Sequence, residues 1–401
     1  MRRVVITGMA SVCSLGTDHN KVFERLCKRE KVTAPIEKNN DVLKKIHSSF
    51  YTPIAQVDET KYTNQLLQIK KRGSLLSYYS AYCALDAVRD AGIEKLDEDT
   101  AVIIGASSPL LDSAVEKCVI FQKTGKAGLM NIPTLMFNST ASWISVILGI
   151  HGRSCVISSA CASGTESIGR AFEDIRSGKY TMSLCGGADY MRDKLWVSLK
   201  SFENLKVVST ESDSSSYPFS EERSGFLYSE GGAGMLVIEE LDHALSRGAR
   251  IYAEITGFEA NCDGYSILSM PENGQNIEMM LRKLVGDKKV DYYNSHGTGT
   301  KLNDMVESNV LRNIFGGRDS QPAINSTKAF LGHTVSASGA LEAIVCAHSI
   351  IENKVHGNVC RTILDDLNYT EETRNVSVDR AVSASFGFGG HNAALLIERY
   401  R

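Results

Sequence analysis

The sequence predicts an α/β protein built from layers of sheet and helix. Short runs of apolar and β-branched residues recur along the 401 residues, and helical patterns lie between them. The runs are apolar at successive positions, which is typical of strands covered on both faces. A diglycine followed by an apolar strand also occurs twice, at 231–241 and 389–400. Two similar halves are one interpretation of this weak repeat, and a chance match of two glycine-rich turns is the other.

The predicted strands are short apolar runs bounded by glycine, serine or charged residues. "VVITG" near the start is one example, because its apolar run ends in a glycine turn. In chain order the strands span 2–8, 100–106, 154–160, 180–188, 233–240, 251–260, 290–297, 381–390 and 392–400. The predicted helices show apolar residues at helical spacing and span 73–92, 164–177, 274–286, 302–315 and 338–352. We expect one half to cover 1–250 and the other 251–401, with the boundary near "DHALSRGAR".

Composition excludes several classes of function. Hydrophobic residues make up 43% and charged residues 23%, as in ordinary globular proteins. A formal charge of −3 argues against a broad nucleic-acid or anionic-membrane surface. The apolar run 143–150 is too short to span a membrane, and the opening run is too short for a signal peptide. Ten cysteines without a C-x-x-C pair favour a reducing cytoplasm, and the histidine spacing gives no support for a metal site.

Cys161 lies where a predicted strand runs into a predicted helix, within "SSACASG". At a helix N-terminus the dipole and free N–H groups stabilise a thiolate, so we expect a lowered thiol pKa. The same N–H groups could bind an oxyanion. A tightly packed core cysteine, as expected for Cys155 and Cys185, is the alternative interpretation.

Two histidines and a lysine occupy similar loops of small residues. His296 ends a predicted strand in "SHGTGT", where an open α/β fold places polar chemistry. His333 precedes a helix, and we expect the dipole to keep its imidazole neutral. Lys328 lies five residues before His333. A simple loop histidine that hydrogen bonds a threonine is the alternative for His296.

The glycine-rich segment "SASFGFGGHN" (383–392) does not predict a dinucleotide site. It lacks the third glycine of G-x-G-x-x-G, and a strand follows it rather than a helix. It reads either as a turn into the last strand or as a mobile loop that presents a backbone N–H to the active site.

Together these segments resemble the β-ketoacyl-acyl carrier protein synthases of the thiolase superfamily, in the elongating branch of fatty-acid and polyketide synthesis. The resemblance runs through "VVITG", "SSACASG", "LCGGAD" (184–189), "YPFSEERSGFLYSEGGAGMLVIEE" (217–240), "SHGTGT", "STKAFLGHTVSASGALEA" (326–343) and "SFGFGGHN". It implies a five-layered αβαβα fold of two similar halves. It also implies a 3-oxoacyl-[acyl-carrier-protein] synthase that transfers an acyl group to its cysteine and condenses it with malonyl-acyl carrier protein, with loss of CO₂.

The resemblance implies a role for each motif residue. Cys161 matches the nucleophile, and His296 and His333 match the pair that promotes decarboxylation and stabilises the enolate. Lys328 matches the family lysine and Glu307 the supporting acid. Phe388 matches the gating phenylalanine, whose N–H joins that of Cys161 in the oxyanion hole. The expected substrate-binding residues in the same motifs are Thr298, Thr300, Phe386 and Gly389.

The implied partners are an acyl carrier protein and a second chain, with no metal or other cofactor. Because carrier proteins are acidic, Lys70, Lys71 and Arg72 are the predicted docking patch, with a solvated helix end as the alternative. Family members dimerise through an extended sheet, so we expect a homodimer or a heterodimer with a related ketosynthase or chain-length-factor subunit.

Neighbouring families fit less well. A thiolase would place a second cysteine in the last glycine loop, and initiating synthases have asparagine where His333 stands. The remaining alternatives are a non-catalytic assembly subunit and a cysteine hydrolase or acyltransferase. The sequence departs from the family pattern at Lys301, at Ser220 and at the pair 153–154. These departures suggest a specialised polyketide or aryl-polyene synthase.

Overall fold

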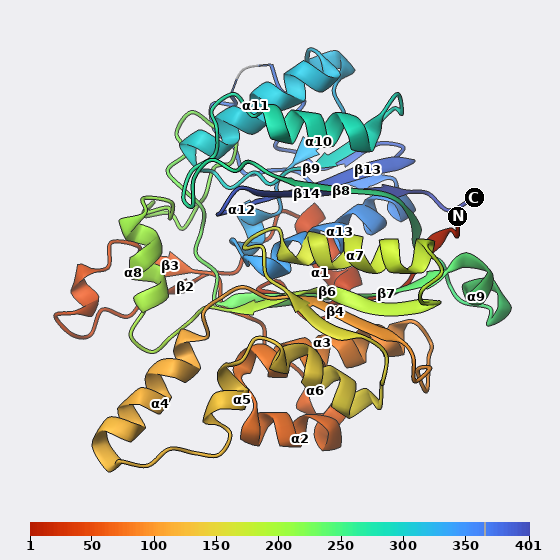
Figure 1. The fold of residues 1–401 in the computed structure, drawn as a ribbon. Helices are drawn as coiled ribbons and strands as arrows, with labels where there is room; N and C mark the ends of the chain where they lie inside the picture. The colour runs from red at the N-terminus through yellow and green to blue at the C-terminus, as the bar shows by residue number, and fades with distance from the viewer. Residues whose placement is uncertain (365) are drawn as a thin grey trace.

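The computed structural model describes residues 1–364 and 366–401 and has the predicted layered α/β architecture. Its main sheet has ten strands and folds back on itself as two five-stranded halves (Figure 1). The halves join where β1 pairs antiparallel with β8 at Val4–Ile6. The first half contains β1 (Val4–Val12), β4 (Ala101–Gly105), β5 (Ser154–Ile157), β6 (Met182–Tyr190) and β7 (Gly231–Glu240). The second contains β8 (Ala253–Cys262), β9 (Tyr292–Asn294), β10 (Ala323–Asn325), β13 (Arg380–Gly387) and β14 (His391–Glu398).

The strand order shows that the two halves are repeats. The first half runs β5-β4-β6-β7-β1 and the second runs β10-β9-β13-β14-β8. In each, the first three strands of that order are mutually parallel and the last two pair antiparallel. The weak diglycine repeat therefore reflects two similar halves, as predicted. The boundary proposed at 250/251 falls between α9 (Leu241–Ser246) and β8 and stays a prediction.

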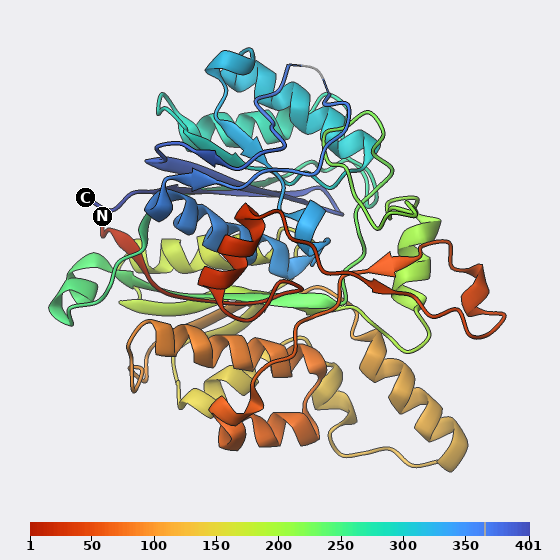
Figure 2. The same ribbon diagram turned by 180° about the vertical axis from the view of Figure 1, so that it is seen from behind.

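Helices fill the three layers around the two half-sheets. The central layer holds α7 (Ser163–Arg176) and α13 (Ser336–Glu352), which contact both half-sheets, with α1 (His19–Cys27) beside α13 (Figure 2). The outer layers hold α2 (Thr63–Arg72), α3 (Leu75–Asp90) and α6 (Ser139–Leu148) on one side, and α10 (Gln275–Val285) and α11 (Lys301–Phe315) on the other. This central placement explains why α13 is buried over nearly its whole length.

Several short elements were not predicted. β10 has only three residues, and the ladders of β2 (Ala34–Pro35) with β3 (Phe50–Tyr51) and β11 (Lys354–Val355) with β12 (Arg374–Asn375) are shorter still. Such elements are too short to show a period. The other helices are α4 (Leu111–Thr124), α5 (Asn131–Leu135), α8 (Val197–Asn204) and α12 (Lys328–Leu331). No helix in the described ranges is long and apolar enough to cross a membrane.

Candidate active site

Cys161 lies in a tight turn between β5 and α7. The strand ends earlier than predicted, at Ile157, and the helix begins at Ser163. Ala160 has a φ of +50°, a left-handed conformation that costs energy for any residue with a Cβ. Its carbonyl accepts hydrogen bonds from the N–H of Ser163 at 3.1 Å and from Ser163 Oγ at 2.6 Å. The strained turn therefore presents Cys161 at the entrance of the central helix.

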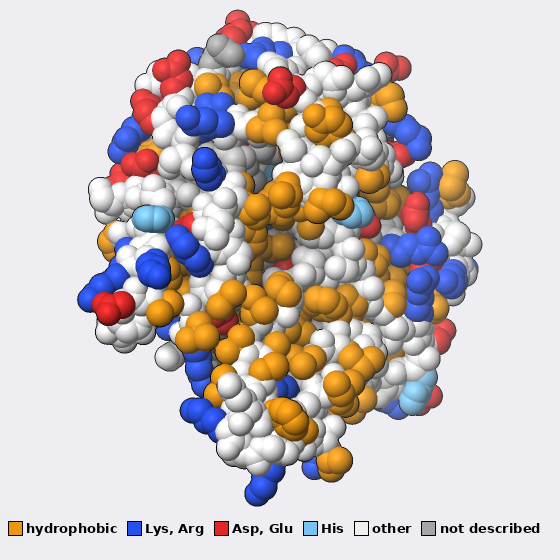
Figure 3. Space-filling model, turned by 60° about the vertical axis from the view of Figure 1, so that its left-hand side comes forward, with side chains coloured by type: hydrophobic (Ala, Val, Ile, Leu, Met, Phe, Trp, Pro, Cys, Tyr) orange, Lys and Arg blue, Asp and Glu red, His pale blue; other side chains and the backbone are white. Residues whose placement is uncertain are grey.

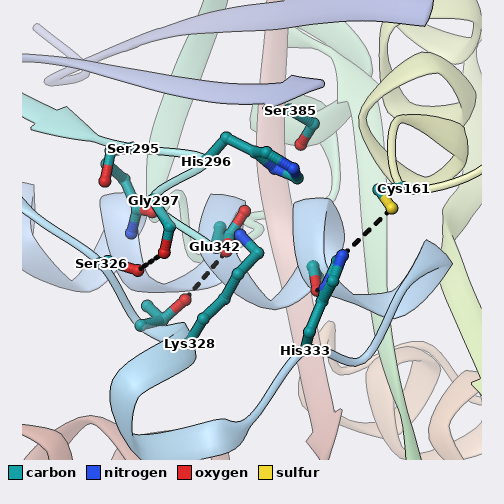
Figure 4. Close-up of polar contacts among 12 residues, drawn as sticks. Cys161, Ser295, His296, Gly297, Ser326, Lys328, His333, Glu342 and Ser385 are labelled. Atoms are coloured by element: carbon teal, nitrogen blue, oxygen red, sulfur yellow. Dashed lines mark hydrogen bonds and ion pairs between the residues drawn. The ribbon is translucent and has the colours of Figure 1, made fainter. Parts of the chain in front are cut away.

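Cys161 and the two histidines meet at this turn although they are far apart in the sequence. His333 Nε2 lies 3.1 Å from Cys161 Sγ (Figure 4). The His296 and His333 rings are 5.6 Å apart at their centroids and nearly perpendicular. The sulfur and one nitrogen of each ring lie within 4.8 Å of one another, and all three residues are buried. Among the described residues, this is the one group of three or more His, Cys, Asp or Glu side chains close enough to share a metal ion.

Glu307 positions His296 through the backbone. From α11, its carboxylate accepts hydrogen bonds from the N–H of His296 and of Gly297, each at 2.9 Å. Tyr293 Oη donates to it at 3.1 Å. Burial raises the pKa of Glu307 to about 7, with neighbouring Asp304 contributing and the N–H donors opposing. The predicted supporting acid therefore holds the histidine loop and touches the backbone of His296, not its ring.

Lys328 is paired with a residue that the sequence did not reveal. Its Nζ lies 2.6 Å from Glu342 Oε1 on α13, and both side chains are almost fully buried (Figure 4). Thr327 Oγ1 donates to the same oxygen at 2.9 Å. A glutamate inside an apolar helical pattern was the available signal, because a charged residue on a buried face needs a partner.

The thiol pKa corrects one prediction. We expected the helix N-terminus to lower it, but burial raises the pKa of Cys161 to about 12 and the carboxylate of Asp189 adds to the rise. Lys328 and the N–H groups of Phe388 and Cys161 act in the opposite direction without reversing it. Desolvation of the thiolate thus outweighs the helix terminus, and the free protein holds a protonated thiol.

Both imidazoles are neutral, as predicted for His333. Burial lowers the pKa of His333 well below its ordinary value, and the charge of Lys328 adds to the shift. The pKa of His296 is lowered by burial, by Lys328 and by His333. The main cause is therefore desolvation, not the helix dipole that we invoked.

The glycine-rich loop brings Phe388 to the nucleophile. The N–H groups of Phe388 and Cys161 both act on the thiol, which places two donors beside the sulfur. Gly387 allows this approach, because a Cβ there would lie 2.6 Å from the carbonyl oxygen of Ser159. The resemblance implies that the same two N–H groups form an oxyanion hole, and this role stays a prediction.

A cavity of about 950 Å³ opens onto these residues. Cys161, both histidines and Phe388 line it, as do the predicted Thr298, Thr300 and Phe386. Gly389 is not part of this lining, and its N–H donates to the carbonyl of Ile267 at 2.9 Å. Its prediction as a substrate-binding residue has no support here, since its backbone donor is already used. Figure 3 shows a hollow bordered by hydrophobic side chains on this face.

The predicted carrier-protein patch lies apart from this lining. Lys70, Lys71 and Arg72 are exposed at the end of α2, and Lys70 Nζ lies 2.7 Å from Glu59. The lysines that do line the cavity are Lys206 and Lys301, both exposed. In the sequence, Lys301 stands out only as a departure from the family pattern.

A buried cysteine facing two neutral imidazoles and two backbone donors, inside a deep cavity of a thiolase-like fold, defines a thiol-dependent acyl-transfer site. Family models agree: residues 1–244 match the N-terminal domain of beta-ketoacyl synthase and residues 252–360 its C-terminal domain. The chain therefore belongs to the beta-ketoacyl synthase family.

Relatives match over essentially the whole chain. Nodulation protein E from a Rhizobium strain is 32% identical, with 98% of each chain covered. 3-oxoacyl-[acyl-carrier-protein] synthase 1 of Haemophilus influenzae is also 32% identical, with 100% of each covered. The ishigamide ketosynthase/chain length factor is a structural neighbour with a TM-score of 0.89, 26% identity and full coverage of both chains. A beta-ketoacyl synthase from Burkholderia phymatum has a TM-score of 0.88 and 29% identity, also with full coverage of both chains.

Proposed function

We propose that the protein is a 3-oxoacyl-[acyl-carrier-protein] synthase that joins an acyl group on Cys161 to a malonyl unit carried by an acyl carrier protein. The observation that carries this proposal is the convergence of Cys161, His296 and His333 in one cavity with their donor atoms within 4.8 Å of one another. A hydrolase would need only the cysteine and one histidine. The second neutral histidine fits a reaction in which an enolate must be stabilised.

In the first step the sulfur of Cys161 attacks the carbonyl carbon of an acyl-carrier thioester. The developing oxyanion accepts hydrogen bonds from the N–H groups of Cys161 and Phe388. The carbon–sulfur bond to the carrier then breaks, and the carrier sulfur leaves with the proton that the Cys161 thiol has lost. Acyl exchange between two thiols involves no change of oxidation state, so this step requires no cofactor.

In the second step a malonyl thioester loses CO₂ and becomes an enolate. His296 and His333, each neutral, donate hydrogen bonds from their ring N–H groups to the enolate oxygen. The enolate carbon attacks the acyl carbon on Cys161, the bond to sulfur breaks, and the β-ketoacyl chain leaves on the carrier. Lys328 favours neutral imidazoles because its charge disfavours a second cation nearby.

The nucleophile is tested by replacing Cys161 with alanine and incubating the protein with an acyl-carrier thioester. Intact-mass spectrometry should show an acyl adduct on the wild type and none on Cys161→Ala. Cys262→Ala is the matched control, since this cysteine is exposed and should leave the adduct unchanged. An adduct that persists without Cys161 contradicts the assignment.

The histidine roles are tested by separating the two steps. His333→Ala should still take up the acyl group on Cys161 but should release no CO₂ from malonyl-carrier protein. Wild-type condensation by this variant would rule out the enolate role. Cys161→Gln should keep decarboxylation and lose condensation.

The partners and the pathway are further parts of the proposal. One neighbouring structure shows a type II polyketide acyl-carrier protein in complex with its ketosynthase, with a TM-score of 0.86 at 25% identity. This supports an acyl carrier protein as the partner and makes polyketide synthesis the second candidate beside fatty-acid synthesis. All ten cysteines are free, which supports our placement of the protein in the cytoplasm.

A further inference from the structure

Asp189 is a fully buried acid near the nucleophile to which the proposed mechanism gives no part. It lies near the end of β6, with a side chain only 1% exposed. We propose that Asp189 is a positioning residue: its carboxylate ties the turn after β4 to the start of α13, so that Ser107 and Ser336 hold the carbonyl of Ala160 and fix the Cys161 turn.

The carboxylate joins segments that are far apart in the chain. Oδ1 accepts hydrogen bonds from the N–H of Ser107 at 3.2 Å and of Ser108 at 2.9 Å. Oδ2 accepts from the N–H of Ser336 at 2.8 Å, and Ser107 Oγ lies 3.5 Å from it. An ionised carboxylate only accepts, so all these contacts match its charged form.

The two serines connect the carboxylate of Asp189 to the turn that holds Cys161. Ser107 Oγ and Ser336 Oγ are 2.6 Å apart, and they approach the carbonyl of Ala160 at 3.3 and 3.4 Å. That carbonyl belongs to the residue with the strained φ of +50°, directly before Cys161. Strained backbone persists only where its surroundings hold it. Removing the carboxylate releases both serines and lets the turn relax.

The charge of Asp189 makes this role measurable. The charged groups acting on Cys161 are Lys328 and Asp189, and a ring nitrogen of each neutral histidine, His333 and His296, lies within 4.8 Å of the sulfur. Lys328 favours the thiolate, whereas Asp189 disfavours it. The charge of Asp189 therefore works against ionisation of the thiol. We explain its presence beside Cys161 by the hydrogen bonds with which it holds the neighbouring segments in place.

The experiment compares Asp189→Asn with the wild type by alkylation of Cys161 with iodoacetamide, without substrate, between pH 7 and 10. Asparagine keeps the size but removes the charge, so the rate curve should shift to lower pH. A shift of half to one pH unit raises the rate at fixed pH by about threefold to tenfold. In the condensation assay, which rests on the proposed function, kcat should fall by about tenfold or more while KM changes by less than about threefold.

Two further variants separate positioning from charge and from general stability. The double variant Ser107→Ala with Ser336→Ala keeps the carboxylate of Asp189, so kcat should fall while the alkylation curve stays in place. If Asp189→Asn does not fold, this double variant still tests the positioning role. Glu239→Gln removes another fully buried carboxylate, in β7, which pairs with Arg247. Glu239→Gln should lower the melting temperature and should change neither the alkylation curve of Cys161 nor kcat.

The proposal is overturned by wild-type kcat in Asp189→Asn or by wild-type kcat in the serine double variant. Failure of the proposed function is distinguishable, because the wild type would then form no condensation product while its alkylation behaviour remained measurable.

Discussion

His296 is held by its backbone, whereas its ring is left free for the reaction. Its N–H and that of Gly297 both donate to Glu307, and the ring Nδ1 has no hydrogen-bond partner among the described residues. A buried polar atom without a partner is costly, and such atoms concentrate at functional sites. The fixed hydrogen bonds therefore hold the backbone of the loop, and the imidazole ring stays available to bind substrate.

Glu307 should make stability depend on pH. Its pKa rises from 4.5 to about 7 on folding, so between these values the folded state holds a proton that the unfolded state has released. The free energy of unfolding should therefore fall as pH rises through this window. A rise of about 2.5 pH units corresponds to about 3 kcal/mol.

Urea unfolding at pH 5 and pH 7.5 tests this effect. Glutamine cannot titrate, so Glu307→Gln should lose about 2 kcal/mol less than the wild type between the two pH values. Asp304, whose pKa is also raised, to about 6, contributes equally to both proteins. Equal losses in wild type and variant would contradict the raised pKa.

At the scale of elements, α7 is the helix that places the nucleophile, and close contacts fix its position. Its first turn approaches α13 at Gly164, where a Cβ would lie 2.3 Å from the carbonyl oxygen of Ser336. Farther along, a Cβ at Gly169 would lie 2.1 Å from the ring of Phe258 on β8. The two central helices pack this tightly because small residues face each other.

Gly164→Ala should therefore move α7 and lower both stability and activity. Overpacking of this kind costs about 1–3 kcal/mol, which thermal unfolding would detect as a lower melting temperature. Gly128→Ala is the control, since its new Cβ would meet only the end of the Asn131 side chain, at 3.1 Å. Unchanged stability in Gly164→Ala would show that the helices separate easily.

The exposed lysines of the cavity lining make a prediction about the carrier protein. Lys206→Glu with Lys301→Glu should raise KM for malonyl-carrier protein by about fivefold or more at low salt, and less at high salt. Alkylation of Cys161 should stay unchanged. The same assay on Lys71→Glu with Arg72→Glu decides whether the patch on α2 also contributes. A KM that stays at the wild-type value in both double variants at low salt would contradict electrostatic docking.

At the scale of the whole molecule, the segment from residue 129 to residue 146 carries apolar side chains that a monomer would leave in water. Ile132 is 69% exposed, Val146 71% and Leu129 98%. These residues belong to α5, α6 and the segment before α5, and β5 is the edge strand of the neighbouring half-sheet. An open strand edge beside an apolar surface favours association with another chain. This agrees with the dimer that the resemblance implies, either of two copies or with a related subunit, which stays a prediction.

If the wild type is a dimer in solution, Ile132→Asp combined with Val146→Asp should convert it into monomers. Burying two carboxylates at an apolar interface costs more than the contacts they replace. Light scattering after size-exclusion chromatography would give the mass directly. Val42→Asp, at an exposed residue distant in sequence, should leave the mass unchanged. A monomeric wild type would rule out the homodimer.

The sequence by itself determined the layered α/β class, the main strands and helices, and the residues that meet in the cavity. Long apolar runs and helical periods are local signals, so β6 and α13 could be predicted within a few residues. Cys161, His296 and His333 could be singled out because small residues surround each of them, and the resemblance joined them into one site.

Only the tertiary structure decided how these residues behave. The direction of the Cys161 pKa shift was wrong in our prediction, because burial depends on layers contributed by distant segments. Glu342 and Asp189 lie inside quoted motifs, but no role could be assigned to them, because their partners lie 14 and about 80–150 residues away in the chain. Desolvation and long-range hydrogen bonding are properties of the packed molecule, so no window of sequence contains them.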